Sequence, residues 1–238
     1  MDRAIVLAAG MGSRLVQGQP YPKPLQPVSK VPLLVRVLRI LQDEGIRDAV
    51  IVTGHLAEPL ERALRADRSL KLELRFVHNA LHQTTANGVS VLAAREWIDG
   101  DVLLTMSDHL YDGEIVRRLR AFDRPKESSV LAVDYDIARC FDLDDATKVR
   151  VENGRIVEIG KELASYNALD TGVFRIGTEL VLALSTIFDA RGDCSLSDGG
   201  RALSVQGRFL ACDIGGAPWI DVDTPEALLH AEAMLAEP

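Results

Sequence analysis

Short apolar runs alternate with amphipathic segments through the first half of the chain, and this alternation constrains the fold more than any other feature. Buried strands are predicted at 3–8, 48–53, 101–106 and 128–135, with a more polar strand at 72–77. Helical periodicity marks the segments between them, at 32–44, 58–66, 87–98 and 113–122. Strands that are apolar on both faces indicate a parallel sheet covered by helices on each side.

The pattern changes after residue 136. A hairpin is predicted over 149–159, because Asn153 and Gly154 supply the two-residue turn that joins alternating segments. Further strands are expected at 170–176 and 208–214, and a terminal helix at 225–236. No repeat or linker interrupts the chain. We therefore predict one α/β domain over 1–238, with a Rossmann-like mixed, mainly parallel sheet and helices on both faces.

Charge and cysteine content narrow the function classes. The chain carries 27 Lys and Arg against 35 Asp and Glu, a net charge of −8. Nucleic acids and anionic membranes both require a basic surface, so neither is expected as a partner. Cys140, Cys194 and Cys212 form no CxxC pair, which favours reduced thiols. The sequence also contains no signal-peptide core and no membrane span, and we expect a cytoplasmic protein.

A long loop over 9–31 follows the first strand, at the edge where open α/β sheets bind ligands. Gly10 and Gly12 let backbone amides approach a phosphate, and Arg14 adds a forked cation. Prolines on both sides hold Lys23 in a restricted segment. The spacing matches neither a Walker loop nor a complete dinucleotide fingerprint. A lone Gly-x-Gly would indicate only a tight turn, but together with both cations it predicts an anion site.

Acidic side chains follow two later strands. Asp108 comes shortly after the apolar run 101–106, while Asp221 and Asp223 stand two residues apart in an extended segment and share a face. Helix capping explains the residues that follow this pair, but not two acids on one face. The three carboxylates would make an oxygen-rich Mg²⁺ site. His109 has no partner histidine at ligand spacing, and we interpret it as structural or substrate-facing.

Two lysines flank the predicted hairpin. Lys148 precedes its first strand and Lys161 follows its second strand. Most lysines are solvated surface charges. Their placement nevertheless allows a phosphate clamp, and the residues alone leave both interpretations open.

Together these segments resemble the nucleotidyltransferase family that activates phosphorylated sugars and alcohols. The resemblance covers nearly the whole chain and begins with LAAGMGSRL and PKPL, where Ser13 stands in place of a common threonine. Within this family, the chain resembles the inositol-1-phosphate cytidylyltransferases in particular. This more specific resemblance rests on the segments TMSDHLY, DATKVRVENGRIVEIGKEL, DTGVF, SLSDGGRAL and WIDVDTPEAL. It implies a nucleotide-diphospho-sugar transferase fold, with a nucleotide-binding half over 1–135 and an acceptor-binding half over 136–238.

The resemblance also implies roles for individual residues. Arg14 and Lys23 would be the catalytic cations, with Lys23 at the α-phosphate. The cofactor would be Mg²⁺, held by Asp108, Asp221 and Asp223. The implied nucleotide contacts are Ala8, Ala9, Gly10, Gly12, Ser13, Asn87 and Gly88, and the implied acceptor contacts are Lys148, Lys161 and Asp170.

The implied reaction joins CTP and inositol-1-phosphate to give CDP-inositol and pyrophosphate. An acceptor phosphate is already ionised at pH 7, so its attack on the α-phosphorus needs no general base. Members of this family are often fused to a membrane alcohol phosphotransferase, which we expect here as a separate downstream protein. A second copy of the chain is the other expected partner.

Several alternatives stay open. Phosphocholine or an aminoalkyl phosphonate such as 2-aminoethylphosphonate would need acids or aromatic rings around its cationic nitrogen. Acids do crowd the segment before the hairpin, at Asp134, Asp136, Asp142, Asp144 and Asp145. A sugar-1-phosphate acceptor fits the N-terminal motif equally well and the later motifs less well. An NAD-dependent oxidoreductase is disfavoured, because no acid ends the strand at 48–53. Intact Lys23, Asp108 and Asp223 argue against a catalytically silent nucleotide-binding regulator.

Overall fold

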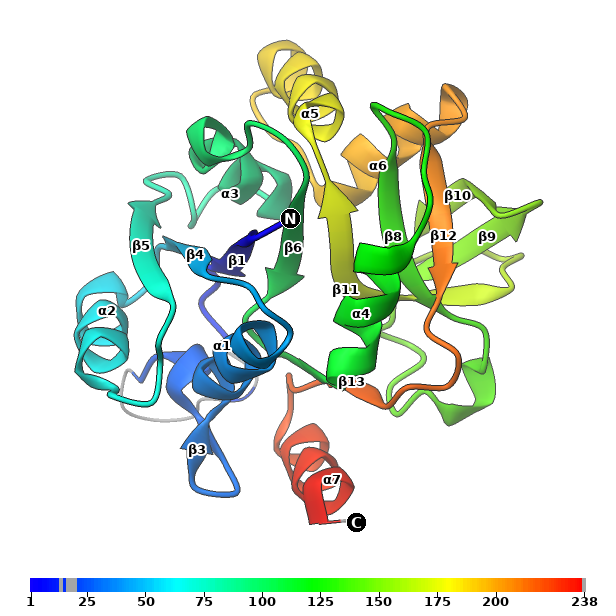
Figure 1. Cartoon of the computed structure of the whole chain (residues 1–238). Coiled ribbons are helices and arrows are strands. Elements are labelled where there is room, and N and C mark those ends of the chain that lie inside the picture. The colour runs from blue at the N-terminus through cyan, green and yellow to red at the C-terminus, as the bar shows by residue number, and fades with distance from the viewer. Residues whose placement is uncertain (13–14, 16–20, 237–238) are drawn as a thin grey trace.

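A nine-stranded mixed sheet forms the centre of the computed structural model, which describes residues 1–12, 15 and 21–236 (Figure 1). The strand order is β5-β4-β1-β6-β11-β8-β12-β10-β9. The strands are β1 (Arg3–Ala8), β4 (Asp48–Thr53), β5 (Glu73–His78), β6 (Val102–Met106), β8 (Ser129–Asp134), β9 (Lys148–Glu152), β10 (Arg155–Gly160), β11 (Ala168–Ile176) and β12 (Phe209–Asp213).

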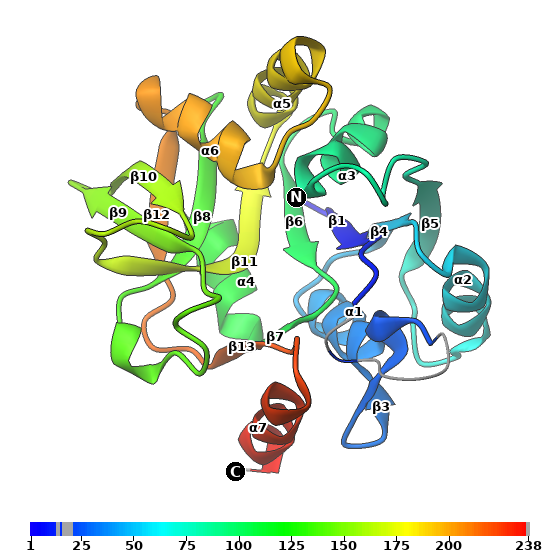
Figure 2. The same ribbon diagram turned by 180° about the vertical axis from the view of Figure 1, so that it is seen from behind.

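Helices cover both faces of this sheet, as predicted. In β1, Ala4 and Val6 belong to the core on one face and Ile5 and Leu7 to the core on the other. A strand buried on both sides has no position for a polar side chain, which explains the continuous apolar runs. The first face packs against α1 (Leu33–Asp43), α2 (Ala57–Ala66) and α4 (Gly113–Ala121). The second face packs against α3 (Asn87–Ala93), α5 (Thr178–Arg191) and α6 (Leu196–Val205), toward the viewer in Figure 2.

The mixed, mainly parallel sheet is confirmed, and the structure adds the strand order, which the sequence did not predict. Strands β5, β4, β1 and β6 pair in parallel, and β8 pairs in parallel with β12. Strand β11 lies between β6 and β8 and runs antiparallel to both. The alternation in the first half therefore predicted each strand but not this insertion, since β11 comes from the second half of the chain.

The helix predicted over 87–98 is two shorter elements. α3 ends at Ala93, and the 3₁₀ helix η2 (Arg95–Trp97) continues the chain. Ala94 and Ile98 are both buried, so the apolar spacing continues across the change in winding. Periodicity could not reveal the break for that reason.

The hairpin in the second half forms as predicted. β9 pairs antiparallel with β10, and the turn residues Asn153 and Gly154 have φ values of 50° and 75°. Positive φ at both central positions is the geometry of a type I′ turn.

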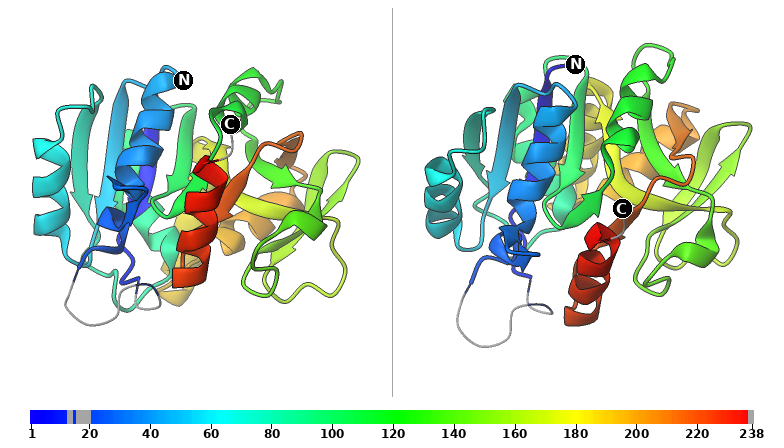
Figure 3. Two further views of the ribbon diagram at one scale, coloured as in Figure 1. Left: turned by 90° about the horizontal axis from the view of Figure 1, so that it is seen from below. Right: turned by 60° about the horizontal axis from the view of Figure 1, so that its bottom comes forward.

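Small structures gather at the carboxyl ends of the parallel strands. β7 (His109–Tyr111) pairs with β13 (Trp219–Asp221), and β2 (Pro27–Val28) pairs with β3 (Val31–Pro32). The terminal helix α7 (Pro225–Ala236) lies below this edge of the sheet (Figures 1 and 3). Within the described residues, no helix is both long and apolar enough to cross a bilayer.

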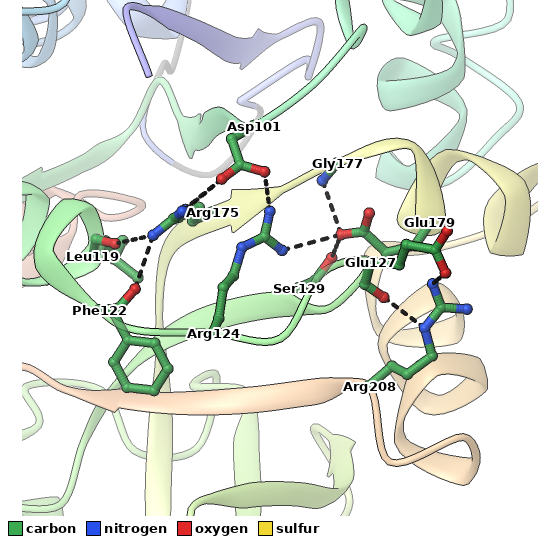
Figure 4. Close-up of polar contacts among 10 residues, drawn as sticks. All are labelled: Asp101, Leu119, Phe122, Arg124, Glu127, Ser129, Arg175, Gly177, Glu179 and Arg208. Carbon is green, nitrogen blue, oxygen red and sulfur yellow. Dashed lines mark hydrogen bonds and ion pairs between the residues drawn. The ribbon is translucent and has the colours of Figure 1, made fainter.

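A network of ion pairs closes the opposite end of the sheet, with Arg124 and Glu179 buried and Asp101 exposed (Figure 4). The Arg124 guanidinium lies between the carboxylates of Asp101 and Glu179, at 3.4 Å from Glu179 Oε1. Glu179 also accepts hydrogen bonds from Ser129 Oγ (2.8 Å) and the Gly177 amide (2.9 Å). Arg175 Nε donates to Asp101 Oδ2 at 3.0 Å. The network thus joins the beginnings of β6, β8 and α5 to the end of β11.

Candidate active site

The predicted acids meet because neighbouring strands end at the same edge. β1 and β6 pair in parallel, and the Ser107 amide donates to the Leu7 carbonyl at 3.0 Å. In the small sheet, Asp221 stands opposite His109, and the Val222 amide donates to the Asp108 carbonyl at 2.9 Å. This pairing brings the segment with Asp221 and Asp223 to the end of β6, across nearly half of the chain.

Lys23 lies between two of these carboxylates. It belongs to the 3₁₀ helix η1 (Lys23–Leu25), and its side chain is only 7% exposed. Its Nζ donates to Asp108 Oδ2 at 2.6 Å and forms an ion pair with Asp223 Oδ1. Gly12, at φ +60°, leaves room for the lysine stem, because a Cβ at this position would overlap it. The predicted anion loop and the predicted acids therefore share one centre.

A cavity of about 430 Å³ opens beside Lys23 on the side of the glycine loop. The predicted nucleotide contacts Ala9, Gly10, Gly12 and Asn87 line it, whereas Ala8 and Gly88 do not. Predicted residues Ser13 and Arg14 lie outside the described part of the chain. Sequence analysis missed His82 and Ser90, which also line this cavity. Ser90 ends the segment that begins at Thr85 and contains Asn87 and Gly88, but only those two residues were singled out. His82 belongs to no motif and carries no signal that distinguishes it from an ordinary loop residue.

Asn87 and Gly88 begin α3 and join it to the second half of the chain. Asn87 Oδ1 accepts a hydrogen bond from the Leu196 amide at 2.9 Å. A Cβ at Gly88 would lie 2.6 Å from the Cys194 carbonyl oxygen, so only glycine allows this close approach. The two residues hold α3 against the start of α6, and Asn87 also reaches both cavities.

A second cavity, of about 530 Å³, lies on the other side of the carboxylates. It shares Asn87, Met106, Asp108 and Asp223 with the first cavity. Its lining includes the predicted residues Asp221, Asp170 and Lys161. Sequence analysis did not single out Arg139, Phe141, Trp219 and His230, which line the same cavity.

The two lysines beside the hairpin differ in their surroundings. Lys161 is half-exposed in the second cavity, with its Nζ 2.5 Å from Asp145 Oδ1. Lys148 is buried, does not line either of these two cavities, and donates from Nζ to the Asp144 carbonyl at 3.0 Å. A role for either lysine in acceptor binding stays a prediction.

His109 is held between a carbonyl and a carboxylate. Its Nδ1 lies 2.8 Å from the Thr171 carbonyl oxygen, and its Nε2 lies 3.5 Å from Asp221 Oδ2. Burial by itself would lower the pKa of His109, but the Asp221 carboxylate outweighs it and raises the pKa to about 9. The imidazolium therefore donates at both nitrogens and fixes Asp221. Burial also raises the pKa of the neighbouring Asp170 to about 6.

The acidic side chains fit a divalent cation. Ligand atoms lie within 4.8 Å of one another in two groups, Asp108 with His109 and Asp221, and Asp145 with Asp221 and Asp223. Most of these donors are carboxylate oxygens, which suit Mg²⁺. The Lys23 ammonium between Asp108 and Asp223 shows that this pair accepts a positive charge. Asp145 was predicted only as part of an acidic segment, and the fold brings it to the site.

Trp219 is the largest side chain that sequence analysis missed. Its Nε1 donates to Asp134 Oδ2 at 2.8 Å, and its ring stacks on His109 with centroids 6.3 Å apart. Phe141 and His230 bring their rings to 4.8 Å on the same cavity. Trp219 comes two residues before Asp221 in the sequence. This closeness to the acidic pair was the signal that could have identified it as a site residue.

Comparisons with known proteins agree with this geometry. Residues 4–206 match the family described as the MobA-like NTP transferase domain. The bifunctional IPC transferase and DIPP synthase of Rubrobacter xylanophilus is 40% identical over 237 residues, which make up 98% of this chain and 51% of that protein. The matching protein of Thermococcus kodakarensis is 32% identical over 235 residues, 98% of this chain and 50% of that protein. The chain thus spans about half the length of the curated relatives it matches.

Two further proteins that are similar to this chain are each named for one activity. The solved structure of the inositol-1-phosphate CTP transferase from T. maritima superposes with a TM-score of 0.86 at 26% identity, covering 100% of this chain and 97% of that one. The CMP-5'-(3-aminopropyl)phosphonate synthase of Streptomyces rubellomurinus is 41% identical over 133 residues, 55% of this chain and 20% of that protein.

Proposed function

Because this chain belongs to the MobA-like NTP transferase domain family, we propose that it transfers the cytidylyl group of CTP to inositol-1-phosphate, forming CDP-inositol and releasing pyrophosphate. The observation that carries the proposal is the pair of cavities that meet at Asp108 and Asp223. One cavity adjoins the glycine loop and suits a nucleotide, and the other suits a second substrate. The names of the R. xylanophilus and T. maritima proteins support the choice of both substrates.

The main obstacle to this reaction is repulsion between two anions. The acceptor phosphate must approach the α-phosphorus of CTP in line with the departing pyrophosphate. Lys23 lines the first cavity, next to Asp108 and Asp223, and would hold the α-phosphate. Backbone amides near Gly10 and Gly12 would hold the outer phosphates. Lys161 on the far side would attract the acceptor phosphate. These positive groups also stabilise the charge that spreads over the phosphoryl oxygens in the transition state.

Asp108, Asp221 and Asp223 would hold Mg²⁺, and we include this cofactor in the proposal. When bound, the ion neutralises phosphate charge and so lowers the cost of bringing the substrates together. His109 contributes indirectly, because its imidazolium fixes the Asp221 carboxylate. Asp145 is a further donor near Asp221 and Asp223.

An aminoalkyl phosphonate acceptor is the second candidate. The lining of the acceptor cavity is rich in acids, and the S. rubellomurinus relative is named for such a product. Carboxylates at Asp142 and Asp145, with the Phe141 ring beside them, would suit a cationic amine. The same carboxylates can accept hydrogen bonds from inositol hydroxyls, so charge alone does not choose between the acceptors. The R. xylanophilus and T. maritima proteins match nearly all of this chain, whereas the S. rubellomurinus relative matches 55% of it, and this difference in coverage favours inositol-1-phosphate.

The test is pyrophosphate release with CTP and Mg²⁺, using inositol-1-phosphate, 2-aminoethylphosphonate, phosphocholine and glucose-1-phosphate in parallel. We expect turnover with inositol-1-phosphate only. Turnover with only an amine-bearing acceptor would favour the second candidate, and absence of turnover with all four would contradict a transferase acting on these substrates. A cytoplasmic location, a second copy of the chain and a membrane alcohol phosphotransferase that uses the product stay predictions.

A further inference from the structure

We propose that Lys23 competes with the metal ion for Asp108 and Asp223, so that the protein binds the ion tightly only together with the nucleotide. The inference rests on the proposed function, because that function assigns these carboxylates to the metal. It concerns the order of binding and gives Lys23 a second role besides holding the α-phosphate.

Lys23 contacts Asp108 and Asp223, the two carboxylates that the proposed function assigns to the metal. Its Nζ lies 2.6 Å from Asp108 Oδ2 and is paired with Asp223 Oδ1. The lysine side chain is 7% exposed, and the two carboxylates are 28% and 19% exposed. An ammonium removed from water in this way requires compensating negative charge, which the two carboxylates supply.

A divalent ion and this ammonium cannot share the same oxygens. An ion bound to Asp108 and Asp223 would lie within about 4 Å of Nζ, where repulsion between like charges is large even at the effective dielectric of a partly buried site. The ammonium must therefore leave before the ion gains full use of both carboxylates. It needs another anion as its partner, since it would otherwise be buried without compensation.

The triphosphate of the nucleotide is the anion within reach. Lys23 and Asp108 both line the cavity beside Gly10 and Gly12. The lysine stem packs against Gly12, and flanking prolines restrict the backbone of the segment, so rotation of the side chain is enough for the transfer. Nucleotide binding would thus exchange the partner of Lys23 and release the carboxylates in one step.

The experiment measures Mn²⁺ binding in the absence of any acceptor. Titrations followed by the electron paramagnetic resonance of free Mn²⁺ are made on the wild type, Lys23→Met and Lys23→Gln. We expect both neutral variants to bind Mn²⁺ alone at least about tenfold more tightly than the wild type, because a unit positive charge beside the ion is gone. Thermal unfolding supplies a second readout, in which Mn²⁺ alone raises the midpoint of the neutral variants more than that of the wild type.

Matched variants separate charge from packing. Lys23→Arg keeps a positive charge, so its Mn²⁺ affinity should stay close to that of the wild type. Lys126→Met removes an exposed lysine that lines neither cavity, and it should leave the Mn²⁺ affinity unchanged. Adding Asp108→Asn to Lys23→Met should abolish the gain, since it removes one of the two carboxylates.

Two results would overturn the inference. One is a wild type that binds Mn²⁺ alone as tightly as Lys23→Met. The other is a gain in affinity that survives Asp108→Asn, which would put the ion elsewhere. Neither result depends on turnover, so the inference can fail in a chain that makes CDP-inositol. The proposed function can likewise fail, through missing pyrophosphate release, in a chain whose Mn²⁺ binding follows this scheme.

Discussion

Lys23 shows how one side chain acquires its function from local sequence and distant partners together. The flanking prolines predicted that its ammonium could be aimed inward, and the buried side chain agrees with that. The structure adds Gly12, where a Cβ would overlap the lysine stem. Its partner Asp108 comes 85 residues after it in the sequence, and its partner Asp223 comes 200 residues after it. Only the pairing of β7 with β13 and of β1 with β6 brings them to Lys23.

Replacing Lys23 tests its catalytic role. Lys23→Ala should lower the turnover number by about 10²–10³, the usual cost of losing one donor that stabilises transition-state charge. The measurement is the initial rate of pyrophosphate release at saturating CTP, acceptor and Mg²⁺. Lys126→Ala, an exposed lysine before β8 and away from both cavities, is the control and should keep the wild-type rate. A Lys23→Ala enzyme with near-normal turnover would remove Lys23 from the mechanism.

Other residues of the candidate site show where the sequence was insufficient. Asp145 was one acid among several in a segment of similar composition, and nothing local distinguished it from Asp142 or Asp144. The structure brings it to within 4.8 Å of Asp221 and Asp223, counted between ligand atoms. For His109, the absence of a second histidine predicted a structural or substrate-facing role, which stays a prediction, and its contact with Asp221 depends on the fold.

Helix α6 illustrates stabilisation at the scale of one element. Ser195 is its N-cap, and its hydroxyl accepts from the Asp198 amide at 3.1 Å. The Asp198 carboxylate accepts in return from the Ser195 amide (2.8 Å) and hydroxyl (2.7 Å). This reciprocal arrangement is a capping box, and it fixes the start of the helix that Asn87 joins to α3.

Removing the charge of Asp198 should make the free energy of unfolding less dependent on pH in the acidic range. Burial by itself would raise the pKa of Asp198, but hydrogen bonds from Ser195 and Arg201 lower it to about 2. A lowered pKa stabilises the fold above the unfolded-state pKa of about 3.9 and ceases to do so as the pH falls toward 2. Asp198→Asn should therefore lower the free energy of unfolding by about 1–2 kcal/mol at pH 7.

Urea unfolding at pH 7 and pH 3.5 measures this difference. The gap between the wild type and Asp198→Asn should be narrower at the lower pH, where the carboxylate gives less stabilisation. Asp189→Asn, at an exposed position of α5, is the matched control and should change little at either pH. A gap that is equal at both pH values would show that the charge of Asp198 contributes nothing.

Element boundaries followed from the sequence wherever local rules decide them. The predicted bounds of β1 and β4 are those observed, and Asn153-Gly154 correctly predicted the β9–β10 turn. The change from α3 to η2 was missed because the apolar spacing is the same on both sides of Ala94. Pairing partners are a different problem, since the position of β11 between β6 and β8 depends on contacts between the two halves.

At the scale of the whole molecule, the candidate site and the ion-pair network are far apart in the fold. The candidate site lies at the carboxyl ends of the parallel strands, and the ion-pair network around Arg124 lies at their amino ends (Figure 4). Members of this network come from positions 101, 124, 129, 175 and 179, and no motif joined them in the sequence. Charged residues are usually exposed, so sequence analysis had no reason to place them in the interior.

Breaking this network should destabilise the fold while leaving the site intact. Arg124 and Glu179 side chains are 5% and 4% exposed, so Arg124→Met leaves a buried carboxylate with less compensating charge. The expected loss in the free energy of unfolding is about 3–5 kcal/mol. Arg208→Met is the control within Figure 4, because its partner Glu127 is 77% exposed and the pair should contribute less than about 1 kcal/mol.

Urea unfolding and turnover are measured on the same preparations. Together they show whether the network affects only the stability of the fold or also the activity of the site. If the network only supports the fold, Arg124→Met lowers the unfolding midpoint but keeps the wild-type turnover number at a temperature where it remains folded. A turnover number that falls in proportion to the lost stability would instead mean that β6 and β11 transmit the change along their length to Asp108 and Asp170. Equal stability losses in Arg124→Met and Arg208→Met would contradict the argument from burial, because the two pairs differ mainly in their exposure to water.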